Sequence, residues 1–245
     1  MISPLPLHPL VADIGSEIGK HWSIGPNPAP GALVSGVLHL DTMLSTLIVM
    51  VLLIVLGLYI RRHLTSGVPG GWQNALEIVT EFLQNTATDL IGERRARTIM
   101  PLAFTLGLYI LLSNLLGLLP TNGRLKSPTA DMNTTFALSF TVILFIWYSG
   151  IRARGGGWFK TWLSPLTWIE EIPKPVTLSL RLFGNIAAGE ILLILLGALP
   201  GVVVTSPIPT VIWVAFSIFI GCIQAFVFVM LTIAYFGIAT ETGGH

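Results

Sequence analysis

The 245-residue chain has little charge and almost no cysteine. Only 10% of its residues are charged, against roughly 25% in a soluble domain, and 53% are hydrophobic. With a mean hydropathy of +0.79, this composition excludes an ordinary soluble domain, and it excludes a disordered chain because so much apolar surface favours burial. A net charge of +1 without a basic patch argues against nucleic-acid binding. The single cysteine, Cys222, excludes an intrachain disulfide, and we expect no metal or other cofactor.

Long uncharged stretches predict membrane helices, since a spanning helix needs about 20 apolar residues. The predicted helices cover residues 42–60, 98–120, 132–151, 176–199 and 208–238. The last two are separated by the turn-forming Pro200, Gly201 and Pro207. At 1.5 Å per residue they would be roughly 36 Å and 46 Å long. Both exceed the hydrocarbon thickness of about 30 Å, so we expect both to be steeply tilted.

Residues 72–97 have a different, amphipathic pattern. Apolar side chains recur at helical spacing at Trp72, Leu76, Val79, Leu83, Ala87 and Leu90. This predicts a helix on the membrane surface, and the alternative is a soluble helix docked on a partner. The predicted fold is therefore an all-α integral membrane protein with about five membrane helices and one amphipathic surface helix. Residues 1–37 are expected to form an external N-terminal segment, and residues 38–245 the membrane domain.

Lysine and arginine are unequally divided between the two predicted sides of the membrane. One side holds Lys20, Arg124 and Lys126. The other side holds Arg61, Arg62, Arg94, Arg95, Arg97, Arg152, Arg154, Lys160 and Lys174. Because cytoplasmic loops carry the excess of basic residues, the second side is predicted to be cytoplasmic. This orientation places the N-terminus outside and the C-terminus inside.

Two charges, Arg181 and Glu190, lie within the fourth predicted membrane helix. A charge at the bilayer centre costs about 2.5–3.5 kcal/mol on insertion scales. The two residues are nine positions apart and so point in nearly opposite directions, which disfavours a direct ion pair within the helix. Arg181 shares its face with the small or polar Gly184, Asn185 and Ala188, which favours docking against a partner that brings an anion. The alternative is that Arg181 snorkels to the cytoplasmic interface.

The opposite placement of Glu190 indicates a polar route through the interior of the bundle. A carboxyl in such surroundings is suited to reversible proton binding. On the last predicted helix, Ser217, Gly221, Gln224 and Tyr235 share one face and would complete this route. For Ser217 and Tyr235 taken singly, interhelical hydrogen bonding is an equally good interpretation.

Four motifs, found in the same order, resemble subunit a of F-type ATP synthases. They are NLLGLLP at 114–120, PTADMN at 128–133, LSLRLFGN with AGE at 178–190, and IQAFVF at 223–228. The resemblance covers roughly residues 35–240, and the lack of a transit peptide favours a bacterial form. It implies a membrane stator subunit in the bacterial inner (plasma) membrane that is not an enzyme on its own. The implied partners are the ring of c subunits, the subunit b peripheral stalk, the rest of the F1Fo complex and the lipid bilayer.

The resemblance also implies roles for individual residues. Protons would reach and leave the carboxylates of the c ring through two half-channels, and Arg181 would separate these channels. Glu190 matches the channel carboxylate, Gln224 the polar residue facing the arginine, and Asn185 an orienting residue of the arginine motif.

The sequence departs from some relatives in two places. Ser217 stands where some relatives have His, and Gly117 where some have Asp. Glu170 and Glu171 match acids that precede the arginine helix in some relatives, and they are either cytoplasmic exit carboxylates or a solvated pair.

The residues alone leave two other functions open. A secondary transporter would show inverted repeats, and none is found. A membrane scaffold would have no need for Arg181 and Glu190 on separate faces of one helix.

Overall fold

The computed structural model describes residues 23–24, 38–63, 71–118, 127–155, 165–198 and 208–241. Its helices are α2 (Leu40–His63), α3 (Gly71–Ile91), α4 (Glu93–Gly117), the short 3-10 helix η1 (Pro128–Ala130), α5 (Met132–Arg154), α7 (Pro165–Glu171), α8 (Pro173–Ala198) and α10 (Ile208–Thr240). The two-residue strands β1 (Ser23–Ile24) and β2 (Leu38–His39) pair antiparallel. The all-α class is thus confirmed. Of the predicted N-terminal segment, residues 1–22 and 25–37 lie outside the described part of the chain.

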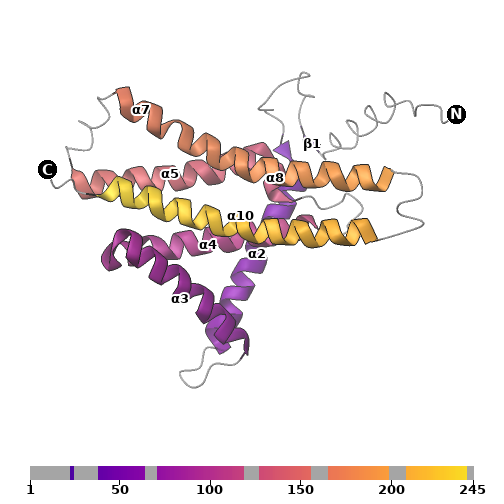
Figure 1. Ribbon diagram of the computed structural model, residues 1–245, viewed down its shortest axis with the longest axis horizontal. Coiled ribbons are helices and arrows are strands. Elements are labelled where there is room, and N and C mark those ends of the chain that lie inside the picture. Colours follow the sequence, from indigo (N-terminus) through magenta and orange to yellow (C-terminus); the bar gives the residue numbers. More distant parts are fainter. Residues whose placement is uncertain are drawn as a thin grey trace.

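Four long helices form the body of the molecule. Figure 1 shows α4, α5, α8 and α10 running alongside one another, with α2 crossing them at a steep angle. α10 is central, since it contacts α3, α4, α5 and α8. α2 contacts α4 and η1 but leaves most of its surface exposed.

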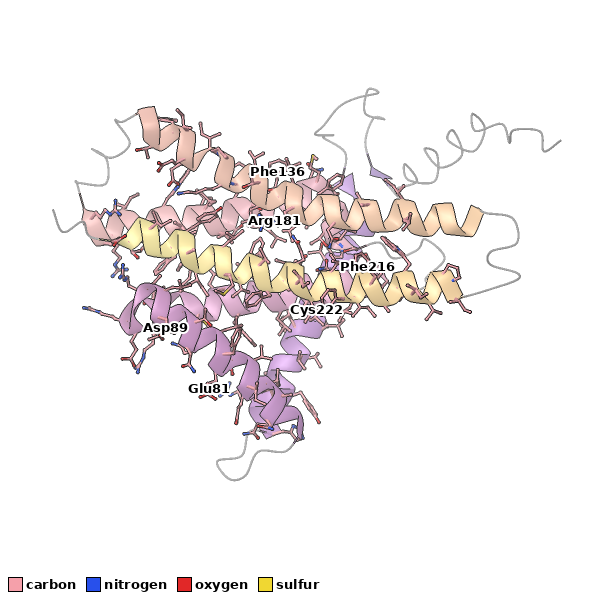
Figure 2. All side chains as sticks on the ribbon, viewed as in Figure 1. Glu81, Asp89, Phe136, Arg181, Phe216 and Cys222 are labelled. Carbon is pink, nitrogen blue, oxygen red and sulfur yellow. The ribbon has the colours of Figure 1, made fainter. Side chains whose placement is uncertain are left out.

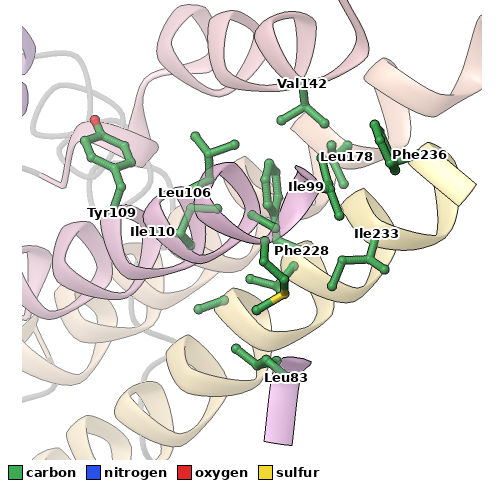
Figure 3. Packing of buried hydrophobic residues seen from close by; sticks show 14 of the residues in the cluster. Leu83, Ile99, Leu106, Tyr109, Ile110, Val142, Leu178, Phe228, Ile233 and Phe236 are labelled. Atoms are coloured by element: carbon green, nitrogen blue, oxygen red, sulfur yellow. The ribbon is translucent and has the colours of Figure 1, made fainter. Parts of the chain in front are cut away.

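The core lies where α4, α5 and α10 meet (Figure 3). α4 contributes Leu106 and Ile110, α5 contributes Val142, and α10 contributes Phe228 and Ile233, all of them buried. Leu106 and Ile110 are four positions apart and lie on nearly the same side of α4, so this helix presents an apolar stripe to its neighbours.

Four helices in the described residues are long and apolar enough to cross a membrane. The candidate spans are Thr42–His63, Glu93–Gly117, Met132–Arg154 and Val211–Thr240. The predicted span at 176–199 is not among these four, but it coincides with α8 in the same bundle. The end of the predicted span 98–120 differs as well, because α4 ends at Gly117.

The predicted surface helix at 72–97 is wrong in its C-terminal part. α3 ends at Ile91, and Glu93 opens α4. The break falls at Gly92, whose φ of 80° lies in the left-handed region that favours glycine. Residues 93–97 are therefore the first turn of the next helix. On α3 itself Leu83, Ala87 and Ile91 are buried.

One end of the bundle gathers the starts of α4 and α8 and the ends of α5 and α10. Arg154, at the end of α5, donates from Nη2 to the carbonyl of Ile238 near the end of α10, at 2.7 Å. A cation there also interacts favourably with the helix dipole. At the other end of α5, Asp131 caps the helix by accepting from the Asn133 amide at 2.9 Å. Arg94, Arg95, Arg97, Arg152, Arg154 and Lys174 thus belong to the same end of the bundle, the end predicted to be cytoplasmic.

Candidate functional site

Arg181 lies on α8. Its side chain is exposed, and Figure 2 shows it where α8 runs beside α10. Among the side chains that the structure describes, it has no hydrogen-bond or ion-pair partner. A guanidinium cannot lose its proton to escape an apolar setting, so this position requires an anion or water from outside the chain.

Buried side chains of α8 pack this helix against its neighbours, α5 among them. Leu178 and Leu182 are buried, and so is Ser179. The Ser179 hydroxyl donates to the carbonyl of Pro175 at 2.7 Å and lies 3.4 Å from the carbonyl of Thr135 on α5. Ser179 is about 200° around the helix from Arg181. Ser179 therefore holds α8 against α5 on the side of the helix roughly opposite Arg181.

Gln224 on α10 lies at about the same height as Arg181. Two contacts set the register of the antiparallel helices: Trp213 Nε1 donates to the carbonyl of Gly189 at 3.4 Å, and Lys174 Nζ lies 5.3 Å from the centre of the Tyr235 ring. Arg181 is midway between Lys174 and Gly189, and Gln224 is midway between Trp213 and Tyr235. Gln224 is only 8% exposed, and its Nε2 atom has no hydrogen-bond partner among the residues that the structure describes. A buried amide donor is thus available at the level of the arginine.

Asn185 and Ser217 line one cavity of about 240 Å³ between α4, η1, α8 and α10. The polar side chains of its wall are Asn114, Ser127, Asn185 and Ser217, and glycines 117, 189 and 221 leave space for it. Phe216, labelled in Figure 2, belongs to the same wall. The structure therefore brings together two of the predicted site residues. Arg181 and Gln224 are not part of this wall.

A buried hydrogen-bond chain supports the α4 side of the cavity. Asn114 donates from Nδ2 to the carbonyl of Gly221 at 3.3 Å, and its Oδ1 accepts from the Thr129 hydroxyl at 3.4 Å. Ser127 donates to the carbonyl of Ser113 at 2.9 Å. These bonds tie η1 and α10 to the last turns of α4.

Two glycines allow this close packing. A Cβ atom at Gly117 would lie 2.7 Å from the Cβ of Ser127, and one at Gly221 would lie 3.2 Å from the Cβ of Asn114. Both distances are shorter than ordinary contacts between carbon atoms. Ser127 therefore occupies the space that a side chain at position 117 would need.

For Glu190, another predicted site residue, the structure describes the backbone but not the side chain. Its backbone belongs to α8, one residue after Gly189 of the cavity wall. Its side chain lies outside the described part of the molecule.

Glu170 and Glu171 differ from each other in their surroundings. Both lie on α7, a short helix that was not predicted. Glu170 is exposed. Glu171 forms an ion pair with Lys174 and accepts a hydrogen bond from Trp147 Nε1 at 3.0 Å. The interpretation of a solvated pair is therefore wrong for Glu171.

Sequence reasoning assigned no site role to Asn114, Ser127 or Trp213. Asn114 is the first residue of the NLLGLLP motif, and this motif is the only sequence feature that indicated a role for Asn114. Its contact with Gly221 joins residues 107 positions apart, so periodicity within one helix could not have revealed it. In the described ranges, no group of three or more His, Cys, Asp or Glu side chains is placed to hold a metal ion.

Comparison with known proteins identifies related chains. The family model of the ATP synthase A chain matches residues 43–237. ATP synthase subunit a of Desulforamulus reducens is 43% identical over 230 residues, which cover 90% of this chain and 83% of that protein. The subunit a of Mycobacterium tuberculosis is 41% identical over 243 residues, covering 92% and 94%. The subunit a of Gloeobacter violaceus is 39% identical over 246 residues, covering 95% and 93%.

Proposed function

The chain belongs to the ATP synthase A chain family, whose members are proton-translocating stator subunits of the membrane sector, and from this premise we propose how its residues guide protons. It is a membrane subunit of the complex that makes ATP and not a catalyst by itself. We assign the cavity between α4, η1, α8 and α10 to the outer half-channel. Arg181 is the barrier that faces the c ring and separates this channel from an inner route.

The proposal rests on Arg181, which is exposed and has no hydrogen-bond or ion-pair partner among the described side chains. A charge at the bilayer centre costs about 2.5–3.5 kcal/mol on insertion scales, and a carboxylate on a docked partner would offset that cost. The surface beside it is open, since a Cβ atom at Gly184 would have no neighbour within 4 Å. A partner helix can therefore approach α8 closely at this point. A ring of c subunits, each with a buried carboxylate, has the required chemistry.

The cavity has the size of a water-filled route, and its largely apolar wall carries a few polar side chains. At about 30 Å³ per water it holds about eight molecules, which Asn114, Asn185 and Ser217 can hydrogen-bond. It lies by the end of α4 and by η1, on the side predicted to face outward. We assign proton transfer from this water to Glu190, one residue beyond the wall glycine Gly189. Ser217 fills with a hydroxyl the position at which some relatives use His.

The inner route is assigned to the opposite end of α8, near α7. Of the two glutamates there, Glu170 suits proton release better, because it is exposed whereas Glu171 is paired with Lys174. The basic residues at this end support a cytoplasmic location for it and an external N-terminus, according to the positive-inside rule. The subunit b stalk and the c ring are the partners, in the plasma membrane of a bacterium.

Substitution of Arg181 in the whole complex tests the proposal. Arg181→Ala is expected to abolish ATP-driven proton pumping into inverted vesicles while the complex stays assembled. Arg181→Lys is expected to fail nearly as badly, since an ammonium lacks the planar fork and loses its proton more readily when desolvated. Arg152→Ala is the control, because Arg152 is an exposed arginine at the end of α5. Normal pumping by the Lys variant would remove the special role of the guanidinium.

A further inference from the structure

A half-buried polar network joins four helices where α7 meets α8. It consists of Trp147 on α5, Glu171 at the end of α7, Lys174 in the first turn of α8 and Tyr235 on α10. Glu171 forms an ion pair with Lys174 and accepts from Trp147 Nε1 at 3.0 Å. Lys174 Nζ also lies 5.3 Å from the centre of the Tyr235 ring, within cation–π range. We call these four residues the junction network.

The network is largely removed from solvent. The side chains of Glu171 and Lys174 are 17% and 14% exposed. A comparable pair at the same end of the bundle, Glu93 and Arg97, is 66% and 73% exposed. Exposed pairs contribute little to stability, whereas breaking a buried pair leaves an uncompensated charge. Glu171 and Lys174 are therefore strongly bound to each other, and through Trp147 and Tyr235 to α5 and α10.

The network lies two helical turns from Arg181 on the same side of α8. Lys174 and Arg181 are seven residues apart, which is about 700° of rotation and about 10 Å of rise. Between them Leu178 and Ser179 are buried against neighbouring helices. A shift or rotation of the first turn would thus be carried to Arg181 by a packed, hydrogen-bonded helix.

We propose that the junction network is a positioning device for Arg181, in which the Glu171–Lys174 pair sets the height and rotation of α8 against α5 and α10. This inference rests on the proposed function, because it assigns the network to the arginine of that site. Glu171 then acts through its pairing and not by carrying protons. Both of its carboxylate oxygens already accept from a neighbour, Oε1 from Lys174 and Oε2 from Trp147.

A double-mutant cycle in the assembled complex tests this proposal. The variants are Glu171→Gln, Lys174→Met and the double variant, with Lys174→Arg as the conservative change. Glu93→Gln is the matched control, because it breaks the exposed pair at the same end. The measurements are ATP-driven proton pumping into inverted vesicles from pH 6 to 9, pumping per ATP hydrolysed, and the amount of the chain in the purified complex.

Each single variant is expected to lower pumping per ATP about three- to tenfold. The double variant should pump no less than the less active single variant, because the losses from two partners of one interaction do not add. Lys174→Arg should retain most of the activity, Glu93→Gln should stay within about twofold of the unchanged complex, and the pH profile should keep its shape. Additive losses would overturn the proposal, as would normal pumping by both single variants. A changed pH profile with Glu171→Gln but not with Lys174→Met would overturn it too, since that result identifies Glu171 as a proton carrier.

The Arg181→Ala variant distinguishes failure of the proposed function from failure of the positioning role. If Arg181→Ala pumps normally, the proposed function fails, whatever the network variants do. If Arg181→Ala is inactive and the network variants behave additively, only the positioning role fails.

Discussion

Replacement of Gly221 by larger residues is expected to slow proton uptake through the cavity. A Cβ atom at this position would lie 3.2 Å from the Cβ and 3.4 Å from the Nδ2 of Asn114. Alanine therefore forces α4 and α10 apart by a few tenths of an ångström or turns the Asn114 side chain. Turning it would break the 3.3 Å bond from Nδ2 to the Gly221 carbonyl.

The magnitude follows from this bond and from the volume of the cavity. One hydrogen bond contributes about 1 kcal/mol, and the same increase in the barrier to proton transfer lowers a rate about fivefold. Gly221→Ala should therefore slow proton uptake about fivefold. Gly221→Val adds two more methyl groups to a cavity that holds about eight waters, and it should slow uptake tenfold or more. Overpacking costs about 1–3 kcal/mol of stability as well.

The assay must separate a blocked cavity from a lost complex. Passive proton flux is measured in vesicles stripped of the catalytic head, and the amount of the chain in the purified complex is measured in parallel. Gly57→Val is the control, since Gly57 lies on the exposed α2 and a Cβ there has no neighbour within 4 Å. Normal flux through a well-assembled Gly221→Val complex would refute the assignment of this cavity to the proton route.

Three further results are expected. Glu190→Asp should keep substantial proton pumping while Glu190→Gln loses most of it, because the proposed task needs a group that ionises; equal pumping by Gln and Glu across the pH range would leave Glu190 a structural residue. Gly184→Leu should leave the chain folded, since its Cβ meets nothing, but should reduce the c subunit that copurifies; undiminished c subunit would place the ring elsewhere. Reporters fused at Met1 and His245 should be external and cytoplasmic respectively, and finding both on one side would contradict five spans.

The membrane helices could be predicted because charge is so scarce. Uncharged stretches at 42–60 and 132–151 lie within α2 (Leu40–His63) and α5 (Met132–Arg154). The helices extend past the predicted ends because basic residues such as Arg62 and Arg154 continue the last turn beyond the apolar stretch. Uncharged length therefore locates a helix better than it locates the ends of that helix.

The border between α3 and α4 could not be read from the pattern. Glu93 and Arg97 are four residues apart and form a 2.5 Å ion pair, a spacing that suits either helix. Only the backbone at Gly92, with φ at 80°, assigns these charges to α4. A glycine in the sequence permits such a break but does not require one.

The sequence could predict which face of its own helix each site residue occupies. It could not predict which residues of different helices come into contact. Helical periodicity placed Asn185 on the arginine face and Ser217 on the polar stripe of the last helix. The cavity that they share with Asn114 depends on α4 packing beside α10. Such packing is set by the fit of many apolar side chains, and no local pattern in the sequence encodes it. The same holds for Trp147, which meets Glu171 from a different helix.

The apolar interior between the cavity and the junction network explains why the position of Arg181 matters. Polar side chains line the cavity as far as Asn185 on α8, and charged ones begin again at Lys174 near the other end. Between them Leu178, Leu182 and Phe228 are buried, and water in such a setting lacks the polar partners it needs. The buried polar side chains at this level include Gln224 and Ser179, so we expect the Arg181 guanidinium, and not apolar packing alone, to block a direct proton route. In the proposed function the proton then moves along the exposed face of α8, and a carboxylate on the docked partner carries it past the guanidinium of Arg181.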